Sequence, residues 1–435
     1  MEMKKLILGL GVTGRSCIEF FTHNNIDFKI FDTRTKNMID EISDYESIQE
    51  KIYFSETPKD LLNNIDEVIV SPGFNPKHKL LEDISKSSIP IITDIDLFKR
   101  SNQAKIISIT GTNGKTTVVS MLEHVLNGCG CTSIACGNNG KSPLTLKENY
   151  KYIILELSSY QLEYMTDFTS HVSLITNITY DHIERHESFQ KYLNIKKNIF
   201  KSSSNLLASN LIKDITNFPK NIRFFGIENK NNTCLINNKW NKKIIFNNKK
   251  IYLNNDSFEY KGMHNLYNIL AVLSISEILD INIEKCFGQL KSYKYLPHRI
   301  ECIKSHNNTS WYNDSKSTNC DSTKAALEFL DKDIILILGG SKKEINYNSL
   351  SNIINEKVKL IIFLGENKDY IKTQLDVDVP TFDVDDMNQA ITLSKKHAKP
   401  YDSVLLSPAS PSFDMYNDYI DRGIAFIKAV ENIVN

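Results

Sequence analysis

Short apolar runs alternate with helix-forming stretches along most of this 435-residue chain. Runs such as "KKLILGL", "AKIISIT" and "DIILILGG" have the length and β-branched content of buried strands. Because parallel strands need helical crossovers between them, the alternation predicts parallel sheets with helices on both faces. The pattern restarts twice. The predicted fold class is therefore α/β with three domains: an N-terminal Rossmann-like sheet, a central mononucleotide-binding domain with a P-loop, and a C-terminal Rossmann-like domain.

Chain length supports the same division, because a single core rarely extends beyond about 250–300 residues. We predict an N-terminal domain over residues 1–93, a central domain over 94–296 and a C-terminal domain over 297–435. Linkers are expected around residues 93–104 and near Pro297. The polar stretch between about residues 210 and 260 predicts strands, with a surface hairpin in its Asn- and Lys-rich part.

The amino-acid composition limits which kinds of binding partner and cellular environment we expect for this chain. The 52 Lys and Arg residues balance 52 Asp and Glu residues, so the chain lacks the basic field on which nucleic-acid binding relies. Its eight cysteines show no zinc or disulfide spacing, which predicts reduced thiols. Glycines interrupt the apolar N-terminal stretch, and no segment is long and apolar enough to span a membrane. We expect a cytoplasmic monomer that does not insert into membranes.

The first glycine loop has the spacing Gly9-x-Gly11-x-x-Gly14, with Asp32 at the end of the next predicted strand. This spacing is typical of a dinucleotide site, in which glycines let the backbone approach phosphates and the acidic residue meets a sugar hydroxyl. A nicotinamide-dependent dehydrogenase would explain it, and so would a tight turn without any ligand. The segment "SPGF", residues 71–74, would lie on the same edge of the sheet.

The second glycine loop, "TGTNGKTT", lies between the strand "KIISI" and a predicted helix. Backbone amides of residues 111–116 can surround a terminal phosphate, Lys115 can neutralise it, and the Thr116 hydroxyl can bind Mg²⁺. The usual P-loop has Gly where this chain has Ile109, so the loop is a shortened variant. Its strand–GKT–helix context is nevertheless more specific than the first loop, and it predicts a nucleoside triphosphate site.

Hard ligands follow the next two strands of the same predicted sheet. Glu156 ends "YIILEL", and Asp181 and His182 follow "VSLITNIT". The carboxyl ends of parallel strands meet at one edge, so Glu156 and His182 are expected near Thr116 and its magnesium.

Taken together, these motifs resemble the Mur ligase family, whose members add amino acids to the peptidoglycan precursor at the expense of ATP. The resemblance rests on "TGTNGKTT", "ELSSYQLE", "NITYDHIERH", "KGMHNLYNILA", "LPHRIE" and "YNDSKSTN", which occur in the family's order. The segments "GLGVTGRS", "FDTR", "SPGF", "GGSKKE" and "LSPASPSFDMYNDYIDRG" resemble the members that join D-glutamate to UDP-N-acetylmuramoyl-L-alanine. The similarity then covers nearly the whole chain.

The resemblance implies a role for each matching residue. Residues expected to hold ATP are Gly111, Thr112, Asn113, Gly114, Lys115, Thr116, Thr117, Asn265, Asn268, His298, Arg299 and Asp314. Those expected to hold the UDP substrate are Thr13, Asp32, Thr33, Arg34, Ser71, Gly73, Asn138 and His182. D-glutamate is expected at Thr318, Lys343, Ser412 and Tyr419. Catalytic roles fall to Lys115, Glu156, His182, Lys196, Arg299 and Lys316.

Two Mg²⁺ sites are also implied, with Thr116, Glu156, His182 and a carbamylated Lys196 as ligands. Lys197 is adjacent and competes with Lys196 for that assignment, as Lys342 competes with Lys343. Pro411 and Tyr419 depart from the residues usual in the D-glutamate pocket.

Three alternatives remain besides the dehydrogenase. A folylpolyglutamate synthase-like enzyme or another ligase of the family shares the ATP residues, but the "DNPR"-like segment of diamino acid ligases is absent. A nucleotide-binding switch would leave the cluster around Arg299, Asp314 and Lys316 unexplained.

Overall fold

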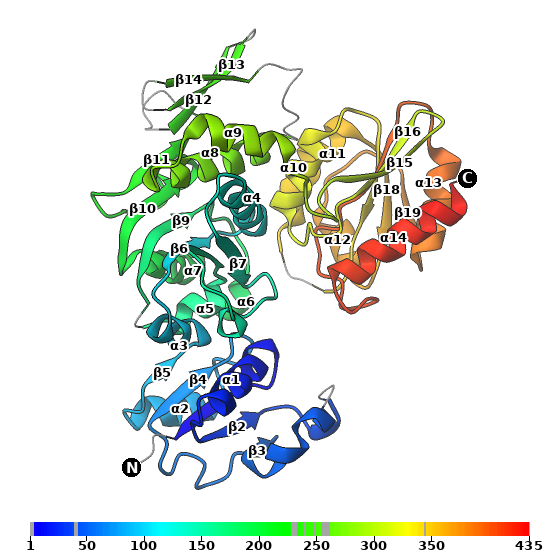
Figure 1. The fold of residues 1–435 in the computed structure, drawn as a ribbon. Helices are drawn as coiled ribbons and strands as arrows, with labels where there is room; N and C mark the ends of the chain where they lie inside the picture. The colour runs from blue at the N-terminus through cyan, green and yellow to red at the C-terminus, as the bar shows by residue number, and fades with distance from the viewer. Residues whose placement is uncertain are drawn as a thin grey trace. The chain divides into compact units, whose positions relative to one another are not determined.

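The computed structural model describes residues 4–38, 42–166, 168–227, 233–238, 241–246, 249–253, 262–342 and 345–434. Three sheets follow one another along the chain (Figure 1). The chain divides into two compact units, one with residues 1–258 and 267–292, the other with residues 259–266 and 293–435. The first unit holds the two N-terminal sheets and the second holds the third sheet.

The N-terminal sheet has five parallel strands in the order β3-β2-β1-β4-β5. Apolar side chains cover both of its faces, with Ile7, Ile30 and Ile69 in one cluster and Leu6, Leu8 and Val70 in the other. Its elements are β1 (Lys5–Leu8), α1 (Val12–His23), β2 (Phe28–Asp32), β3 (Ile52–Phe54), β4 (Glu67–Val70), α2 (Lys79–Lys86) and β5 (Ile91–Ile92).

The central sheet has the order β14-β13-β12-β11-β10-β9-β6-β8-β7, parallel from β7 to β12 and antiparallel at β13 and β14. Its strands are β6 (Lys105–Thr110), β7 (Ser133–Gly137), β8 (Tyr152–Glu156), β9 (Ser170–Ile175), β10 (Ser203–Ser209), β11 (Arg223–Gly226), β12 (Thr233–Asn238), β13 (Asn241–Phe246) and β14 (Lys249–Leu253). Its helices are α4 (Lys115–Gly128), α5 (Ser159–Tyr164), α6 (Ile183–His186), α7 (Phe189–Lys197), α8 (Gly262–Ile278) and α9 (Ile283–Ser292).

The C-terminal sheet has the order β15-β16-β20-β17-β18-β19, and only the β15–β16 pair is antiparallel. Its strands are β15 (Glu301–His306), β16 (Thr309–Asn313), β17 (Ile334–Leu338), β18 (Val358–Leu364), β19 (Thr381–Val384) and β20 (Ser403–Leu406). Its helices are α10 (Cys320–Phe329), α11 (Ser351–Lys357), α12 (Lys368–Gln374), α13 (Met387–His397) and α14 (Tyr419–Ile433).

The predicted α/β class is confirmed, and the hairpin expected between residues 210 and 260 is present as β12 and β13. The segment expected to link the first two domains, residues 93–104, contains helix α3 (Asp94–Ser101). Thr93 accepts a hydrogen bond from the Asp96 amide, and the Asp96 carboxylate accepts one from the Thr93 amide. This capping box stabilises a helix in a segment whose polar composition suggested a loop.

Within the described part of the chain, no helix combines the length and apolar character that a bilayer crossing requires.

The glycines of the first loop provide a matched test of this packing. A Cβ on Gly14 would lie 2.0 Å from the Gly9 carbonyl oxygen, whereas one on Gly11 would meet no atom within 4 Å. Gly14→Ala therefore has to push α1 away from the loop, an overpacking strain of roughly 1–3 kcal/mol. We expect Gly14→Ala to lower the thermal transition of the N-terminal domain by about 5 °C, and Gly11→Ala to leave it nearly unchanged. Equal transitions in scanning calorimetry would contradict this packing.

Candidate functional site

The loop between β6 and α4 is held in shape by the segment that follows β9. The Thr112 amide donates to the Asn177 carbonyl oxygen (2.9 Å), and the Asn113 amide donates to Asn177 Oδ1 (2.8 Å). Thr176 Oγ1 and Asn177 Nδ2 both donate to the Asn113 carbonyl oxygen. Two loop amides, those of Thr112 and Asn113, therefore donate hydrogen bonds within the protein. The amides of residues 115–117 lie in the first turn of α4, where an amide has no carbonyl acceptor within its own helix.

Two glycines of this loop have backbone conformations that L side chains rarely adopt. Gly111 has φ +153°, and a Cβ there would lie 1.9 Å from Thr176 Oγ1. Gly114 has φ +83° and precedes α4, and a Cβ there would lie 2.7 Å from Asn268 Oδ1. Asn268 of α8 therefore lies directly against the loop.

Two lysines converge on one carbonyl group of the loop. Lys115 Nζ donates to the Gly111 carbonyl oxygen (2.8 Å), and so does Lys196 Nζ of α7 (2.9 Å). Lys196 is fully buried, and burial, followed by the positive charge on Lys115, lowers its pKa well below the usual value. Lys197 instead donates to Thr216 and Asn217, away from the loop. Of the two adjacent lysines, only Lys196 lies at the glycine loop.

Glu156 ends β8 with its side chain buried. Its Oε1 accepts a hydrogen bond from Asn138 Nδ2 (3.0 Å), while its Oε2 has no partner among the described residues. A buried carboxylate oxygen without a donor is costly unless something else, such as a cation, compensates it. Asn138, predicted to contact the UDP substrate, is placed here as the residue that orients Glu156.

His182 has a left-handed backbone conformation (φ 55°) at the start of α6. Its Nδ1 lies 3.1 Å from the Tyr160 hydroxyl, and its Nε2 lies 3.5 Å from Asp181 Oδ2. The Arg185 guanidinium lies over the Tyr160 ring at 4.2 Å from the centroid. The ring of His182 is therefore held between two polar partners, and its side chain is still 44% exposed.

The residue types at this edge fit Mg²⁺. The described residues contain no group of three His, Cys, Asp or Glu side chains close enough to hold a metal by themselves. Mg²⁺ typically binds through one or two carboxylates, with phosphate oxygens and water completing its octahedron. The unpartnered Oε2 of Glu156 and the hydroxyl-bearing Thr116 beside the glycine loop agree with that mode.

In the N-terminal domain, Asp32 is fully engaged by the protein. Its Oδ2 accepts from the Leu10 amide (2.6 Å) and from Arg34 Nη2 (2.9 Å), and its Oδ1 accepts from Arg34 Nε (3.0 Å). Burial alone would raise the pKa of Asp32, but the hydrogen bonds from Arg34 and Leu10 outweigh it and the pKa is lowered. Asp32 thus shapes the glycine loop and fixes Arg34, whose side chain is 43% exposed.

Of the other residues predicted for the UDP substrate, Ser71 contacts the same loop. Ser71 Oγ donates to the Gly9 carbonyl oxygen (3.1 Å), which joins the segment after β4 to the glycine loop. Thr13 lies in the first turn of α1, and Thr33 and Gly73 are exposed.

In the second unit, residues predicted for the acyl phosphate and for D-glutamate meet. Lys316 Nζ lies 3.9 Å from the centroid of the Tyr419 ring. Ser412 is buried, Thr318 is half-buried, and Lys343 lies outside the described residues. Its competitor Lys342 is exposed and pairs with Glu366 (3.3 Å).

The turn at residues 298–300 presents Arg299 between two residues with left-handed backbones, His298 (φ 61°) and Ile300 (φ 49°). Asp314 Oδ1 accepts from the Ile300 amide, and Asp314 Oδ2 accepts from Ser317 Oγ and Ser407 Oγ. The ring of His298 is buried and accepts a hydrogen bond from Asn313. Asn265, the other predicted ATP residue of this unit, is also buried.

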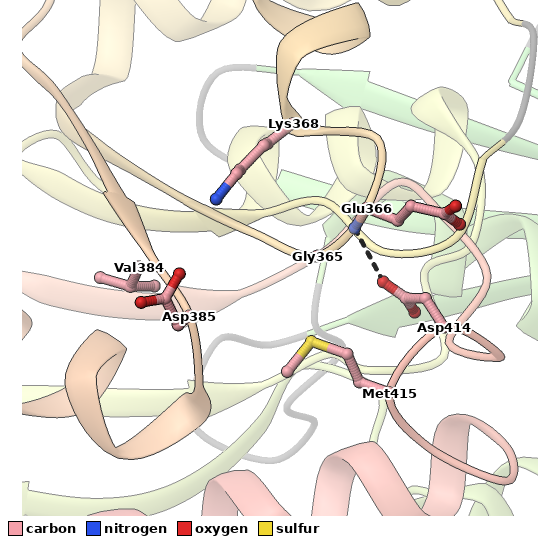
Figure 2. Close-up of a pocket in the computed structure, with 7 residues that line it drawn as sticks. All are labelled: Gly365, Glu366, Lys368, Val384, Asp385, Asp414 and Met415. Carbon is pink, nitrogen blue, oxygen red and sulfur yellow. Dashed lines mark hydrogen bonds between the residues drawn. The ribbon is translucent and has the colours of Figure 1, made fainter.

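A cavity of about 360 Å³ opens at the carboxyl edge of the C-terminal sheet, and Figure 2 shows its lining. Its lining carries one lysine, Lys368, and three acidic residues, Glu366, Asp385 and Asp414. In Figure 2 the Glu366 carboxylate points away from Lys368, and the Glu366 amide donates to Asp414 Oδ2 (3.0 Å). Thr318, Ser412 and Tyr419 are not part of this lining. The described part of this lining therefore does not include the described residues of the predicted amino-acid pocket.

Sequence reasoning missed two arginines that organise the site. Arg422 is buried in α14; its Nε and Nη2 donate to the side chain and carbonyl of Ser315, and its Nη1 donates to the carbonyls of Ser410 and Pro411. It thereby ties the loop before Lys316 to the loop before Ser412. Arg185 donates to Glu163 and to the Phe74 carbonyl oxygen. Both lie in the quoted motifs, but nothing in their spacing revealed partners more than 100 residues away.

Comparison with known families agrees with this geometry. The chain matches the Mur ligase MurD-like N-terminal domain over residues 3–93, the Mur ligase middle domain over 109–276 and the Mur ligase glutamate ligase domain over 298–410. A UDP-N-acetylmuramoylalanine--D-glutamate ligase of Buchnera aphidicola is 36% identical, over 99% of this chain and 98% of the relative. The chain belongs to the Mur ligase family. A ligase of the same name from Legionella pneumophila is 31% identical to this Mur ligase, over 98% of this chain and 99% of the relative.

Solved structures support the fold of this Mur ligase. A pseudomurein peptide ligase type C from Methanothermus fervidus superposes with a TM-score of 0.65 at 18% identity, covering 99% of this chain and 100% of that one. A UDP-N-acetylmuramate-alanine ligase from Thermotoga maritima gives 0.60 at 18% identity, covering 99% of each chain. The three-domain Mur ligase architecture predicted from the sequence is confirmed.

The buried carboxyl of Asp314 predicts a pH dependence of stability. Burial raises the pKa of Asp314 to about 7, against the hydrogen bonds from Ser317 and Ser407. Between pH of about 4 and about 7 the folded state holds a proton that the unfolded chain releases, so this group makes stability fall as the pH rises through that window. Asp314→Asn should remove that fall, measured by denaturant unfolding of the C-terminal domain at pH 5 and pH 8. The exposed Asp321→Asn on α10 is the control, and identical slopes in both variants would contradict the assignment.

Proposed function

We propose that this chain is an ATP-dependent ligase that joins D-glutamate to UDP-N-acetylmuramoyl-L-alanine in peptidoglycan precursor synthesis, releasing ADP and phosphate. The observation that carries the substrate assignment is its 31–36% identity, over nearly the full length, to relatives named UDP-N-acetylmuramoylalanine--D-glutamate ligase. The geometry supports the ATP part, since two lysines and an unpartnered carboxylate oxygen lie around one glycine loop.

The reaction needs an activated acyl group. The substrate carboxylate attacks the γ-phosphate of ATP to give an acyl phosphate, and the amino group of D-glutamate then displaces phosphate to leave an amide. Two like unit charges about 4 Å apart repel by roughly 4 kcal/mol at an effective dielectric near 20. Lys115 would offset this repulsion at the phosphate, because its ammonium group is already positioned against the loop.

Lys196 would serve as a carbamate rather than as a second ammonium group. Two ammonium groups on one carbonyl oxygen repel, and a lysine buried like Lys196 is readily neutral and therefore nucleophilic toward carbon dioxide. Carbamylation would convert it into an anionic oxygen ligand. Thr116, Glu156, His182 and this carbamate would then hold two Mg²⁺ ions, which supply positive charge to the transferring phosphoryl group.

Residues of the second unit receive their roles from the family resemblance. Arg299 and Lys316 would stabilise the acyl phosphate, and Asp314 would support the turn that presents Arg299, as its hydrogen bond to the Ile300 amide suggests. Asn265 and His298 would assist ATP binding. D-glutamate would lie at Thr318, Lys343, Ser412 and Tyr419, on loops that Arg422 ties together.

The first glycine loop would hold the uridine diphosphate part of the substrate. Thr13, Asp32, Thr33, Arg34, Ser71 and Gly73 would contact this part. Asn138 and His182 would support the diphosphate and muramoyl end. A dehydrogenase would need Asp32 free to accept from a ribose hydroxyl, whereas both of its oxygens already accept from Leu10 and Arg34. We further propose that the enzyme works as a monomer in the cytoplasm, where its nucleotide substrates are made.

Phosphate release from ATP tests the function directly. We expect release only when UDP-N-acetylmuramoyl-L-alanine and D-glutamate are both present, and we expect Lys115→Ala to lower kcat by about 10²–10³-fold, since it removes a charge aimed at the transferred group. L-glutamate and a diamino acid serve as control substrates. Release that follows another amino acid would overturn the substrate, and full activity of Lys115→Ala would overturn the site.

The two adjacent lysines give a matched test of the carbamate. Lys196→Ala should lower kcat by at least about 10²-fold because a metal ligand is lost, while Lys197→Ala should stay near wild type. Short carboxylic acids such as acetate should restore part of the activity of Lys196→Ala by supplying the missing oxygen ligand. Full activity of Lys196→Ala without added acid would exclude the assignment.

A further inference from the structure

A second cavity of the first unit lies at the opposite edge of the central sheet from the glycine loop. It has a volume of about 480 Å³ and is lined by the amino ends of three adjacent strands, β6, β9 and β10, together with residues of α3 and the segment that follows α7. Lys105 begins β6 and Thr110 ends it, so the length of the strand, roughly 16 Å, separates this cavity from the glycine loop.

The lining is basic. Lys99, Lys105 and Lys201 contribute ammonium groups, His171 contributes an imidazole, and no Asp or Glu occurs among the described lining residues. Lys105 and Lys201 form no ion pair with any residue that the structure describes. Burial, followed by the positive charge on Lys105, lowers the pKa of His171. In a chain whose charges balance overall, the three ammonium groups leave a local positive charge at neutral pH that no carboxylate of the described lining compensates, and the His171 imidazole beside them is neutral there.

Hydroxyl groups complete the lining. Three of these hydroxyl groups make no hydrogen bond to a described residue, and all three side chains are exposed: Thr169, Ser202 and Ser204. Ser170 and Ser203 are engaged within the protein, through Ser173 Oγ and the Asn205 carbonyl oxygen. Ammonium and hydroxyl donors without matching acceptors are the groups that hold phosphate oxygens.

We infer that this cavity binds a small phosphate-bearing anion, at a site separate from the ligase reaction. A cavity of about 480 Å³ suits a small molecule. Its three lysines do not make the extended basic surface that nucleic acid requires. The proposal does not depend on the proposed function, because none of its residues belongs to the glycine loops or to the predicted D-glutamate site.

His171 reports on this site directly. Full-length protein labelled with ¹⁵N-histidine is titrated with pH in the absence and presence of inorganic pyrophosphate, and the His171 resonance is assigned with His171→Gln. A bound anion stabilises the protonated imidazole, so pyrophosphate should raise the pKa of His171. An unchanged His171 titration at millimolar pyrophosphate would overturn the inference.

Paired charge removals separate this cavity from the glycine loop, which also binds phosphate. The variant Lys105→Gln/Lys201→Gln should weaken the pyrophosphate response of His171 by at least about tenfold, because each charged hydrogen bond contributes on the order of 1.5 kcal/mol or more. Lys213→Gln/Lys220→Gln removes the same charge from exposed positions of the same domain and should keep the response. If both double variants weaken the pyrophosphate response of His171 equally, the response depends only on the net charge of the protein and the proposed site is overturned. Citrate serves as a carboxylate control, and a response to citrate as strong as that to pyrophosphate would overturn the preference for phosphate.

Discussion

The hydrogen bonds between the glycine loop and the segment after β9 are the constraint on which the rest of the central site depends. Strand β9 pairs with β6, so Thr176 and Asn177 emerge beside the loop that follows β6. Asn177 accepts hydrogen bonds from the Thr112 and Asn113 amides, through its carbonyl oxygen and Oδ1. Thr176 Oγ1 and Asn177 Nδ2 donate to the Asn113 carbonyl oxygen. The loop is therefore shaped before any phosphate arrives, and the ordering cost of binding is reduced.

The loop conformation brings ionisable side chains close together. Gly111 directs its carbonyl oxygen toward Lys115 and Lys196, and the Glu156 carboxylate on neighbouring β8 has one oxygen without a partner. Burying a lysine beside another lysine is unfavourable unless the group is neutral or modified. The neighbouring lysines and the unpartnered carboxylate oxygen are therefore electrostatically unfavourable by themselves. A bound nucleotide can compensate the lysines and a bound metal ion the carboxylate, as is typical of catalytic sites.

More of the fold than of the candidate site could be predicted from the sequence. Buried strands such as β6, β8 and β17 are continuous apolar runs, so their type and order were predictable from local pattern. Helix α3 was missed although Thr93 and Asp96 have capping-box spacing, because a short polar segment gives a weak periodic signal. For the site, position at the strand ends predicted that Glu156 and His182 lie at the edge of the sheet that holds the glycine loop, and Glu156 is paired with Ile109 at the end of β6. The hydrogen-bond partner of each side chain depends on residues that are distant in the sequence, as for Asn138 and Glu156. No local sequence pattern predicts such contacts.

Asp32 shows why the same sequence signal can support different chemistry. An acidic residue at the end of the second strand usually suggests a ribose contact in dinucleotide enzymes. Here Arg34, two residues later, folds back onto the carboxylate and onto the Leu10 carbonyl oxygen. The carboxylate therefore neutralises and orients the Arg34 guanidinium, and its oxygens are already engaged where a ribose hydroxyl would need them. The glycine spacing and the acidic position alone thus do not identify the ligand of such a loop, because a residue two positions further along changes what the carboxylate can bind.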